Sequence, residues 1–234
     1  MPDLSIVIPC YNEAENIPLL IKSIDGNYKP DTEIILVDNG STDDTPAVLL
    51  EGLKSVSNAL IRSVRVENNI GYGHGIMAGV HEARGEIIAW THADMQTDPG
   101  DVIAAYENYI NVERFEDSIL KGKRIGRNPL DAFFTLGMSI LSTLLLKVII
   151  TDVNAQPKVF HKSFLKKMND APDDFSLDLY LLYQAKINGY QILKYPVHFG
   201  KRLHGEAKGG GTLKGKWKLI KRTWSYMNEL RDKL

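Results

Sequence analysis

Residues 33–43 of this 234-residue chain are Glu33-Ile-Ile-Leu-Val-Asp-Asn-Gly-Ser-Thr-Asp43. A short apolar run is followed at once by a polar loop that contains a glycine. A run this short and apolar is typical of a buried strand in a parallel sheet. Similar runs lie on both sides of it, so we expect strands at 4–8, 33–37, 61–66 and 86–90.

Helix start signals separate these strands. Asn12 lies three residues before Glu15, which is a capping-box spacing, and Ser41 begins a similar spacing. Asp98-Pro99 predicts an N-cap with proline at the first helical position. Because strands and helices alternate, we expect a parallel sheet with right-handed crossovers and helices on both faces.

The second half of the chain has a less regular pattern. We expect strands at 118–124, 158–160 and 191–199, and a helix at 177–188 that ends at Gly189. Residues 209–211 are three glycines, and a basic tail follows them. The chain contains no internal repeat, and its length fits one large domain or two small ones.

The composition is that of an ordinary globular protein, with 44% hydrophobic and 24% charged residues. It excludes a disordered or fibrous chain. The single cysteine, Cys10, excludes an internal disulfide and fits a reducing compartment. We expect no secretory signal at the start of this sequence, since Asp3 interrupts it and the apolar run that follows is short.

The formal net charge of −1 argues against an anionic partner, but the charges are unevenly distributed. Residues 1–100 carry 6 basic and 15 acidic groups, a net charge of −9. Residues 201–234 carry 10 basic and 3 acidic groups, a net charge of +7. A basic tail on an acidic body favours either an anionic partner or a solvated basic helix.

The most apolar stretch, residues 133–150, contains one charged side chain, Lys147. Its length would just suit a membrane span. However, polar residues recur every three or four positions along it, which predicts an amphipathic helix. These residues are Thr135, Ser139, Ser142, Thr143 and Lys147. We expect a helix that is buried or lies at a membrane interface, rather than a true span.

Polar and glycine-rich residues follow each expected strand. Ligands of open α/β sheets bind beyond the carboxyl ends of the strands, so these loops form the candidate site. Asp38 and Asp94 follow apolar strands, where a carboxylate has no structural role unless something pairs with it. The loop Gly71-x-Gly-x-Gly75 lacks the G-x-G-x-x-G spacing of dinucleotide-binding proteins. Its glycines are better explained by close backbone approach to a ligand or by a tight turn.

Asp94 and Gln96 offer two oxygen ligands at one strand end. Oxygen ligands in this number suit Mg²⁺ or Mn²⁺, which take further oxygens from water and from phosphates. A metal ion that bridges two phosphates neutralises a departing diphosphate. The sequence therefore predicts a divalent metal site that could activate a nucleotide sugar.

Three motifs occur in order along the chain: Ser5-Ile-Val-Ile-Pro-Cys-Tyr-Asn-Glu13, Ile35-Leu-Val-Asp-Asn-Gly-Ser-Thr-Asp43 and Ala93-Asp-Met-Gln96. Together they resemble the signatures of inverting family 2 glycosyltransferases, and most of all the polyprenyl-phosphate (dolichol-phosphate) sugar transferase branch. The resemblance extends from about residue 3 to about residue 210. It implies the GT-A fold, which is α/β with a Rossmann-like, mixed and mostly parallel sheet and helices on both faces.

The resemblance implies a division of the chain. Residues 1–210 would form a single catalytic domain, with a nucleotide-sugar-binding half at 1–100 and an acceptor-binding half at 101–210. Residues 211–234 would form a basic amphipathic tail.

The resemblance also implies a donor site. Residues that would bind the nucleotide sugar are Pro9, Tyr11, Glu13, Asp38, Gly71, Gly73, His74, His92, Ala93 and Asp94. The metal ligands would be Asp94 and Gln96. The family usually has Asp-Ala-Asp at this strand end, and His92 replaces the first aspartate here.

The acceptor site follows from the same resemblance. Arg124, Arg127 and Gln156 would face the acceptor phosphate, and Gln156 belongs to Asp152-Val-Asn-Ala-Gln-Pro157. Asp178, in Phe175-Ser-Leu-Asp178, would open the acceptor-side helix. Arg202, in a loop that continues to Glu206, would contact the donor diphosphate. We assign catalytic roles to Asp178, Arg202 and Arg124.

The function expected from this resemblance is metal-dependent, inverting transfer of a sugar from a UDP- or GDP-linked donor to a polyprenyl phosphate. A phosphate acceptor is already nucleophilic at neutral pH, whereas a hydroxyl acceptor would need Asp178 as a base. The first alternative is a soluble transferase that acts on a sugar hydroxyl of a glycan. The second is a non-catalytic binder of nucleotide sugars or nucleic acid, although the acidic first hundred residues argue against a nucleic-acid partner.

Two segments suggest where the protein acts. Residues 133–150 and 211–234 could place the site at an anionic bilayer, because each nearby basic residue contributes about 1 kcal/mol. The tail interleaves Trp217, Ile220 and Trp224 with lysines, which fits an interfacial helix or a helix that packs on the body. We therefore expect a cytoplasmic protein, peripheral on the cytoplasmic membrane face if these contacts form.

Overall fold

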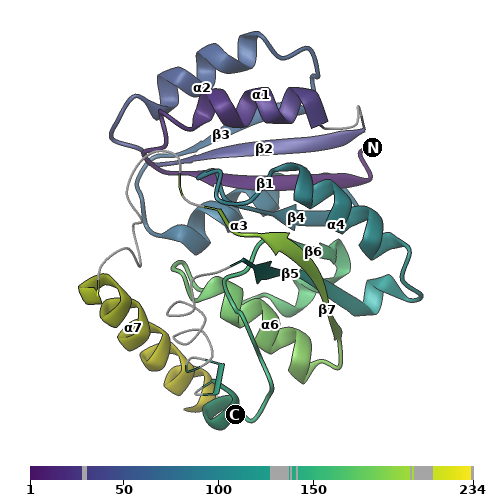
Figure 1. Ribbon diagram of the computed structural model, residues 1–234, viewed down its shortest axis with the longest axis vertical. Helices are drawn as coiled ribbons and strands as arrows, with labels where there is room; N and C mark the ends of the chain where they lie inside the picture. The colour runs from purple at the N-terminus through teal and green to yellow at the C-terminus, as the bar shows by residue number, and fades with distance from the viewer. Residues whose placement is uncertain are drawn as a thin grey trace.

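The computed structural model describes residues 1–27, 31–126, 137, 139–140, 142–200, 202 and 213–232. The strands in these ranges are β1 Leu4–Cys10, β2 Thr32–Asn39, β3 Ile61–Val66, β4 Ile87–Trp90, β5 Ser118–Ile125, β6 Lys158–His161 and β7 Gln191–His198. Within the described residues they form one seven-stranded sheet in the order β3-β2-β1-β4-β6-β5-β7 (Figure 1).

The sheet is mixed and mostly parallel, which confirms the expected fold class. Strands β1 to β4 run parallel to their neighbours among themselves, and β5 runs parallel to β7. Strand β6 is antiparallel to both β4 and β5. Cys10 pairs with Asp38 and Val7 with Trp90 in the parallel registers, so the ends of β1, β2 and β4 meet at one edge.

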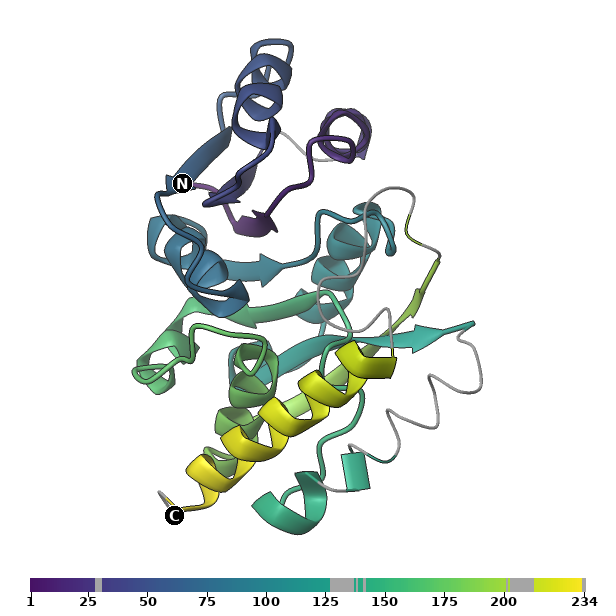
Figure 2. The same cartoon turned by 90° about the vertical axis from the view of Figure 1, so that its left-hand side faces the viewer.

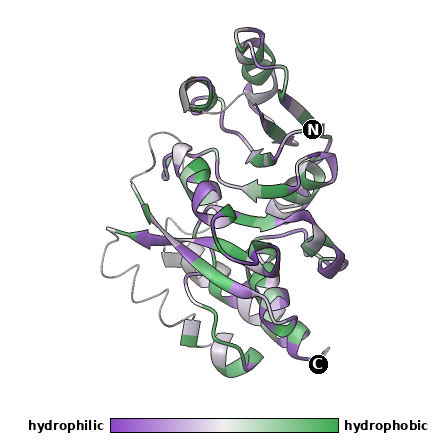
Figure 3. Ribbon diagram, turned by 90° about the vertical axis from the view of Figure 1, so that its right-hand side faces the viewer, coloured by the Kyte–Doolittle hydropathy of each residue, from purple (hydrophilic) through white to green (hydrophobic). Residues whose placement is uncertain are grey.

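Helices cover both faces of this sheet (Figures 1 and 2). They are α1 Ile17–Asn27, α2 Thr45–Lys54, α3 Tyr72–Glu82, α4 Gly100–Ile110, α6 Leu177–Ile187 and α7 Leu213–Asp232, with 3₁₀ helices at Phe115–Asp117 and Lys162–Lys167. Alternate strand residues divide into two cores. Ile6 and Ile8 pack with α1, α2 and α4, whereas Val7 packs in the core that holds α3, α6 and α7. Figure 3 shows the mostly hydrophobic colouring of the central strands.

Two helix starts differ from the predicted ones. Asn12 is not an N-cap, because its φ is +51° and α1 begins only at Ile17. Its backbone N–H instead donates to the Ser41 hydroxyl at 3.1 Å, and its side-chain oxygen accepts from the Thr42 N–H at 2.9 Å. Ser41 is likewise not a cap, since α2 begins at Thr45. Both polar residues join two loops across the sheet edge instead of ending a helix.

The third helix start lies close to its prediction. Helix α4 begins at Gly100, and Pro99 occupies the N-cap position. The Asp98 carboxylate accepts the Gly100 N–H at 2.8 Å. Asp98 therefore serves the helix start, as its position before proline predicts.

The apolar stretch at 133–150 lies partly outside the described residues. Within the described part, Ser139 and Ser142 are buried, whereas Ile140 and Leu144 are 53% and 71% exposed. Leu146 and Ile150 are also buried, in the core that holds α6 and α7, whereas Lys147 is exposed. The described part of the segment therefore packs on the body through polar and apolar residues alike and leaves other apolar side chains exposed. In the ranges given above, no helix has both the length and the apolar character needed to cross a membrane.

Much of the basic tail forms α7, which runs along the half of the molecule that contains α6 (Figure 2). Met227 and Leu230 are buried in the same core as α6. Trp217 and Trp224 are 71% and 43% exposed. Of the two alternatives for the tail, the helix does pack on the body, but through Met227 and Leu230 rather than through the two tryptophans.

Candidate active site

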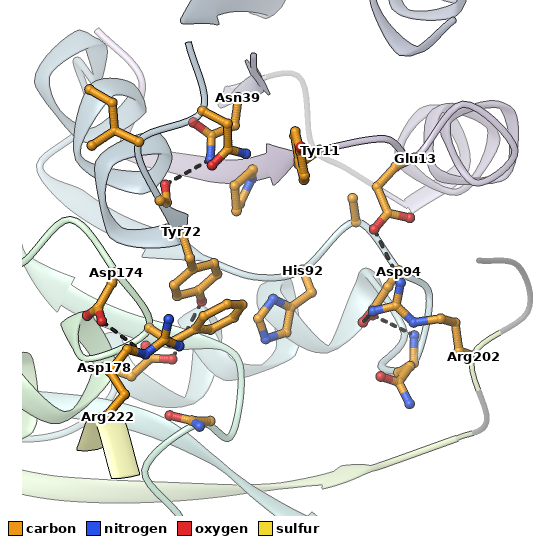
Figure 4. Close-up of a pocket in the computed structure, with 18 of the residues that line it drawn as sticks. Tyr11, Glu13, Asn39, Tyr72, His92, Asp94, Asp174, Asp178, Arg202 and Arg222 are labelled. Atoms are coloured by element: carbon orange, nitrogen blue, oxygen red, sulfur yellow. Dashed lines mark hydrogen bonds and ion pairs between the residues drawn. The ribbon is translucent and has the colours of Figure 1, made fainter. Parts of the chain in front are cut away.

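A cavity of about 470 Å³ opens at the edge where β1, β2 and β4 end (Figure 4). Loops of the first half form one wall, and α6, α7 and the loop before β6 form the other. Described residues that line it are Pro9, Tyr11, Glu13, Asn39, Asn69, Ile70, Gly71, Tyr72, His92, Ala93, Asp94, Gln96, Arg124, Asn154, Asp174, Phe175, Asp178, Phe199, Arg202 and Arg222. Most of the predicted donor residues are brought together here.

Arg202 lies between two carboxylates at one end of the cavity. Its Nη2 is 2.7 Å from Asp94 Oδ2, and its Nη1 is 3.3 Å from Glu13 Oε1. All three side chains are largely buried. The loop after β7 is held beside the β4 loop because Gln96 and Gly200 exchange hydrogen bonds, with the Gly200 N–H donating to the Gln96 carbonyl at 2.7 Å. Folding thus joins three segments that are far apart in sequence.

These residues fit a divalent cation. Glu13 and Asp94 already hold a positive guanidinium between them, so the site is built to neutralise a cation. The described residues contain no group of three or more His, Cys, Asp or Glu side chains that could bind a metal alone. Mg²⁺ needs only one or two protein carboxylates when phosphates and water supply the other oxygens. Asp94 and Gln96, which both line the cavity, match that pattern.

Asp38 does not line the cavity. It is buried at the end of β2, where its Oδ1 accepts the Ser41 N–H at 3.0 Å and its Oδ2 is 3.2 Å from Arg65 Nη1. The next residue, Asn39, lines the cavity instead and donates from Nδ2 to the Gly71 carbonyl at 2.9 Å. Sequence reasoning missed Asn39, although the alternation of side chains along a strand could have suggested a neighbour of Asp38.

The glycine loop packs against the chain's own backbone. A Cβ atom at Gly71 would lie 2.3 Å from the Asp173 carbonyl oxygen, and one at Gly73 would lie 2.1 Å from the Pro172 carbonyl oxygen. His74 also faces this segment, because its N–H donates to the Asp173 carbonyl at 2.9 Å. Of these three predicted residues, only Gly71 lines the cavity. The close approach expected of a ligand is made by residues 172–174.

Asp178 forms the floor of the cavity and is almost fully buried. Trp90 Nε1 donates to it at 3.1 Å, and Gln156 Nε2 donates at 3.0 and 3.3 Å. Lys158 Nζ lies 3.1 Å away. Tyr72 OH is 3.5 Å from the same carboxylate, and burial together with this negative charge raises the pKa of Tyr72. Asp178 is therefore held by donors on several sides.

Two buried lysines hold the loop that contains Gln156. Lys158 donates to the Val153 and Ala155 carbonyls at 3.0 and 2.8 Å. Lys121, its neighbour across the β5–β6 register, donates to the Asp152 carbonyl at 2.7 Å. Burial lowers the pKa of Lys121 to about 7 and also lowers the pKa of Lys158, although Asp178 opposes the shift at Lys158. Sequence reasoning missed both lysines.

Arg124 is fixed by the same loop. It forms an ion pair with Asp152, and its backbone N–H donates to Asp152 Oδ2 at 3.0 Å. Burial alone would raise the pKa of Asp152, but the charge and hydrogen bonds of Arg124 lower it. Arg124 thus lines the cavity as an oriented cation, while Arg127 and Glu206 lie outside the described residues.

His92 and Tyr72 lie side by side in the centre of the cavity, with ring centroids 5.5 Å apart. Burial lowers the pKa of His92, although Asp94 opposes this shift. The imidazole is therefore neutral at pH 7 and occupies the position where the related motif has a carboxylate.

Arg222 of α7 also reaches the cavity, which sequence reasoning missed. Its Nε is 3.0 Å from Asp174 Oδ2, and its guanidinium carbon lies 5.1 Å from the centre of the Phe175 ring. The alternation of basic and apolar residues in the tail predicted contact with a surface. It contained no signal for a single inward arginine.

The chain is similar to known glycosyltransferases in sequence. Residues 5–139 match the family model for glycosyl transferase family 2. The chain is 29% identical to dolichyl-phosphate beta-glucosyltransferase ALG5A of Trichomonas vaginalis, over 93% of this chain and 72% of that protein. It is 30% identical to dodecaprenyl-phosphate galacturonate synthase of Rhizobium johnstonii, over 71% of this chain but only 50% of that protein.

Solved structures share the fold. Glucosyl-3-phosphoglycerate synthase of Mycobacterium tuberculosis, solved with Mn²⁺ and UDP, has a TM-score of 0.74 at 17% identity, over 98% of this chain and 80% of that chain. Mannosyltransferase PcManGT of Pyrobaculum calidifontis, solved with GDP-Man and Mn²⁺, has a TM-score of 0.67 at 20% identity, over 90% of this chain and 59% of that chain. These likenesses confirm the predicted GT-A fold.

Proposed function

The chain belongs to glycosyl transferase family 2, and we propose that it transfers a sugar from a nucleoside-diphosphate sugar to a polyprenyl phosphate at a membrane surface. Two relatives named above are sugar transferases of dolichyl and dodecaprenyl phosphates, which supports a lipid-phosphate acceptor. UDP and GDP-Man occur in the structural neighbours, which supports a donor with one of these nucleotides.

The ion pairs of the acidic side chains in the cavity support a phosphate rather than a hydroxyl as the acceptor. Each carboxylate that lines the described cavity lies in an ion pair: Glu13 and Asp94 with Arg202, Asp174 with Arg222, and Asp178 with Lys158. A hydroxyl acceptor needs a base that can take its proton. A phosphate monoester, with a second pKa near 6, is largely ionised at neutral pH and needs none. The cavity offers arginines, which suit phosphates.

The proposed reaction is a single displacement. A phosphate oxygen of the acceptor forms a bond to the anomeric carbon as the bond from that carbon to the donor diphosphate breaks. The nucleoside diphosphate departs with the electron pair, and the configuration inverts. Arg202 is placed to stabilise the departing charge. Asp94 and Gln96 would hold Mg²⁺ or Mn²⁺, which when bound neutralises the diphosphate.

The exposed apolar side chains support a peripheral membrane contact. Ile140, Leu144 and Ile149 are exposed on one segment, and Trp217 and Trp224 are exposed on α7. The two segments are neighbours, because Ser142 and Ile220 line the same small cavity. Tryptophan is enriched at membrane interfaces, and exposed apolar groups of this kind mark interaction surfaces.

The test combines donor and acceptor. A thermal-shift panel of UDP-, GDP- and dTDP-sugars with Mn²⁺ identifies the donor, because a bound ligand stabilises the fold by RT ln(1 + [L]/Kd). The donor is then incubated with polyprenyl phosphate in vesicles with or without anionic lipid, and separately with sugar hydroxyl acceptors. We expect transfer to the lipid phosphate that is faster on anionic vesicles.

Transfer to a sugar hydroxyl alone would contradict the proposed acceptor. It would indicate instead that a side chain in the cavity acts as a base. His92 would be the candidate, because its imidazole lines the described cavity. Rates that do not respond to anionic lipid would remove the membrane part of the proposal. Donor binding without hydrolysis or transfer would support the non-catalytic alternative.

A further inference from the structure

We infer that helix α7 completes the acceptor site: Arg222 binds the acceptor's phosphate, and an adjoining apolar crevice holds the first carbons of its hydrocarbon chain. The inference rests on the proposed function and adds to it a binding site with a defined polarity. It assigns to the basic tail a direct role inside the cavity, beyond contact with a membrane.

Arg222 enters the cavity from the side opposite Arg202 (Figure 4). Asp174 engages its Nε at 3.0 Å, and the Phe175 ring supports the guanidinium from one face. The Nη amino groups are further donors of the fork, and that fork suits bidentate recognition of phosphate. An arginine held by a carboxylate on one edge and a ring on its face is oriented before a ligand arrives.

A continuous series of contacts connects Arg222 with the floor of the cavity. Phe175 stacks on Tyr72, with centroids 4.8 Å apart and planes 6° apart. The Tyr72 hydroxyl accepts a hydrogen bond from Gln156 at 3.0 Å and lies near Asp178. A phosphate at Arg222 would therefore be connected, through Phe175 and Tyr72, to Gln156 and Asp178 at the floor of the cavity.

The crevice begins where the large cavity ends. It has a volume of about 80 Å³ and shares Asn154 and Phe175 with the large cavity. Its other lining residues are Ser142, Val153, Ser176, Leu179, Ile220 and Thr223. No charged side chain is among these described residues. An apolar cavity of about 150 Å³ holds a benzene molecule. The crevice, at about 80 Å³, is about half that size and so has room for a chain segment of a few carbons.

The two features match one kind of ligand. Arg222 lies between Ile220 and Thr223 in the sequence of α7, so one helix presents a cation to the large cavity and lines the apolar crevice beside it. A group that is anionic at one end and branched hydrocarbon next to it fits both. Prenyl phosphates have this polarity, and Val153, Leu179 and Ile220 offer hydrocarbon an apolar contact in a crevice whose described lining carries no charge.

The experiment measures binding of farnesyl phosphate and farnesol by titration calorimetry in detergent-free buffer. Arg222→Ala should lower the affinity for farnesyl phosphate by at least about tenfold, because the arginine recognises the phosphate. The affinity for farnesol should stay within about twofold of the wild-type value. Thr223→Phe should weaken both ligands, because the added ring fills the crevice. Lys221→Phe is the matched control, since it removes a charge and adds the same ring at an exposed position of the same helix.

The binding and transfer results together separate failure of this site from failure of the proposed function. Unchanged farnesyl phosphate affinity in Arg222→Ala, or in Thr223→Phe with a native melting temperature, would overturn the inference, as would a wild-type chain that binds neither ligand. Wild-type sugar transfer to farnesyl phosphate with variants that bind normally would leave the proposed function standing without this site. Binding that responds as expected, without any transfer, would keep the site and contradict the proposed function.

Discussion

The two ends of the cavity hold their carboxylates in different ways, and we name them by their proposed roles: the donor end contains Arg202 and the acceptor end contains Asp178. At the donor end, Arg202 is 18% exposed and its partners Glu13 and Asp94 are each 10% exposed. At the acceptor end, Lys158 and Asp178 are 0% and 2% exposed. The donor-end pair can open toward a ligand, because water and phosphate can replace each partner. The acceptor-end pair cannot open without leaving a bare charge in the interior.

This difference matches what each end must do in the proposed reaction. The donor end must accept and release a diphosphate with its counter-ion, so its ion pairs have to exchange partners. The acceptor end must keep Gln156 and the loop before β6 in place. Lys158 serves both Asp178 and two loop carbonyls, and thus fixes the floor of the cavity to the sheet.

The largest expected effect is on folding at the acceptor end. Lys158→Met leaves Asp178 buried without its cation, and breaking a buried pair in this way costs about 3–5 kcal/mol. Urea unfolding followed by circular dichroism measures the loss. Lys162→Met is the control, because Lys162 is 47% exposed and lies 3.8 Å from Glu86, and an exposed pair contributes at most about 1 kcal/mol.

The double variant Lys158→Met with Asp178→Asn sharpens this prediction. It removes both charges, so it should be more stable than Lys158→Met alone. If Lys158→Met costs no more than Lys162→Met, the contrast between the two ends of the cavity does not hold.

The next effect is on activity at the donor end. Arg202→Ala removes a donor that would stabilise the departing diphosphate, and losses of this kind lower kcat about 10²–10³-fold. Its free energy of unfolding should fall by less than that of Lys158→Met, since the Arg202 pairs are 10–18% exposed whereas the Lys158 pair is almost fully buried. Steady-state kinetics and urea unfolding of the same preparation separate the two quantities. A stability loss as large as that of Lys158→Met would show that both ends are structural.

Strand positions and loop chemistry were predictable from the sequence, because burial of short apolar runs fixes where β1, β2 and β4 end. That edge necessarily gathers Glu13 and Asp94. Helix starts were less predictable, because Asn12 and Ser41 bond to each other's loops and such pairing depends on tertiary structure. The pattern around Asn12 is that of a cap, and only the neighbouring loop changes its role.

The acceptor end was less predictable for a related reason. Lys121 lies in β5 and Lys158 opens β6, and a lysine in a strand normally reaches solvent. Their burial depends on carbonyls and on Asp178, which are distant in sequence or reached only across the sheet. Arg222 is one of many basic residues in a tail, and nothing in its spacing distinguishes it. Long-range partners, rather than local propensity, decide these positions.

The last expected effect concerns pH and Lys121, and it is small over any single pH unit. Burial lowers the pKa of this ammonium to about 7, whereas an unfolded lysine has a pKa near 10.4. Between these values the unfolded chain binds a proton that the folded chain does not, so this group makes stability rise with pH. Below about pH 7 both states are charged, and the folded chain bears the full cost of the buried ammonium.

Lys121→Met removes this dependence. The wild type should therefore gain stability relative to Lys121→Met as the pH rises from about 7 to 10. The slope is at most about 1.4 kcal/mol per pH unit for one proton. Urea unfolding at several pH values measures it, and groups common to both chains cancel. A flat difference would mean that Lys121 stays charged when buried. The acceptor end would then hold two buried ammonium groups against Asp178, and its rigidity would depend on the carbonyls that surround them.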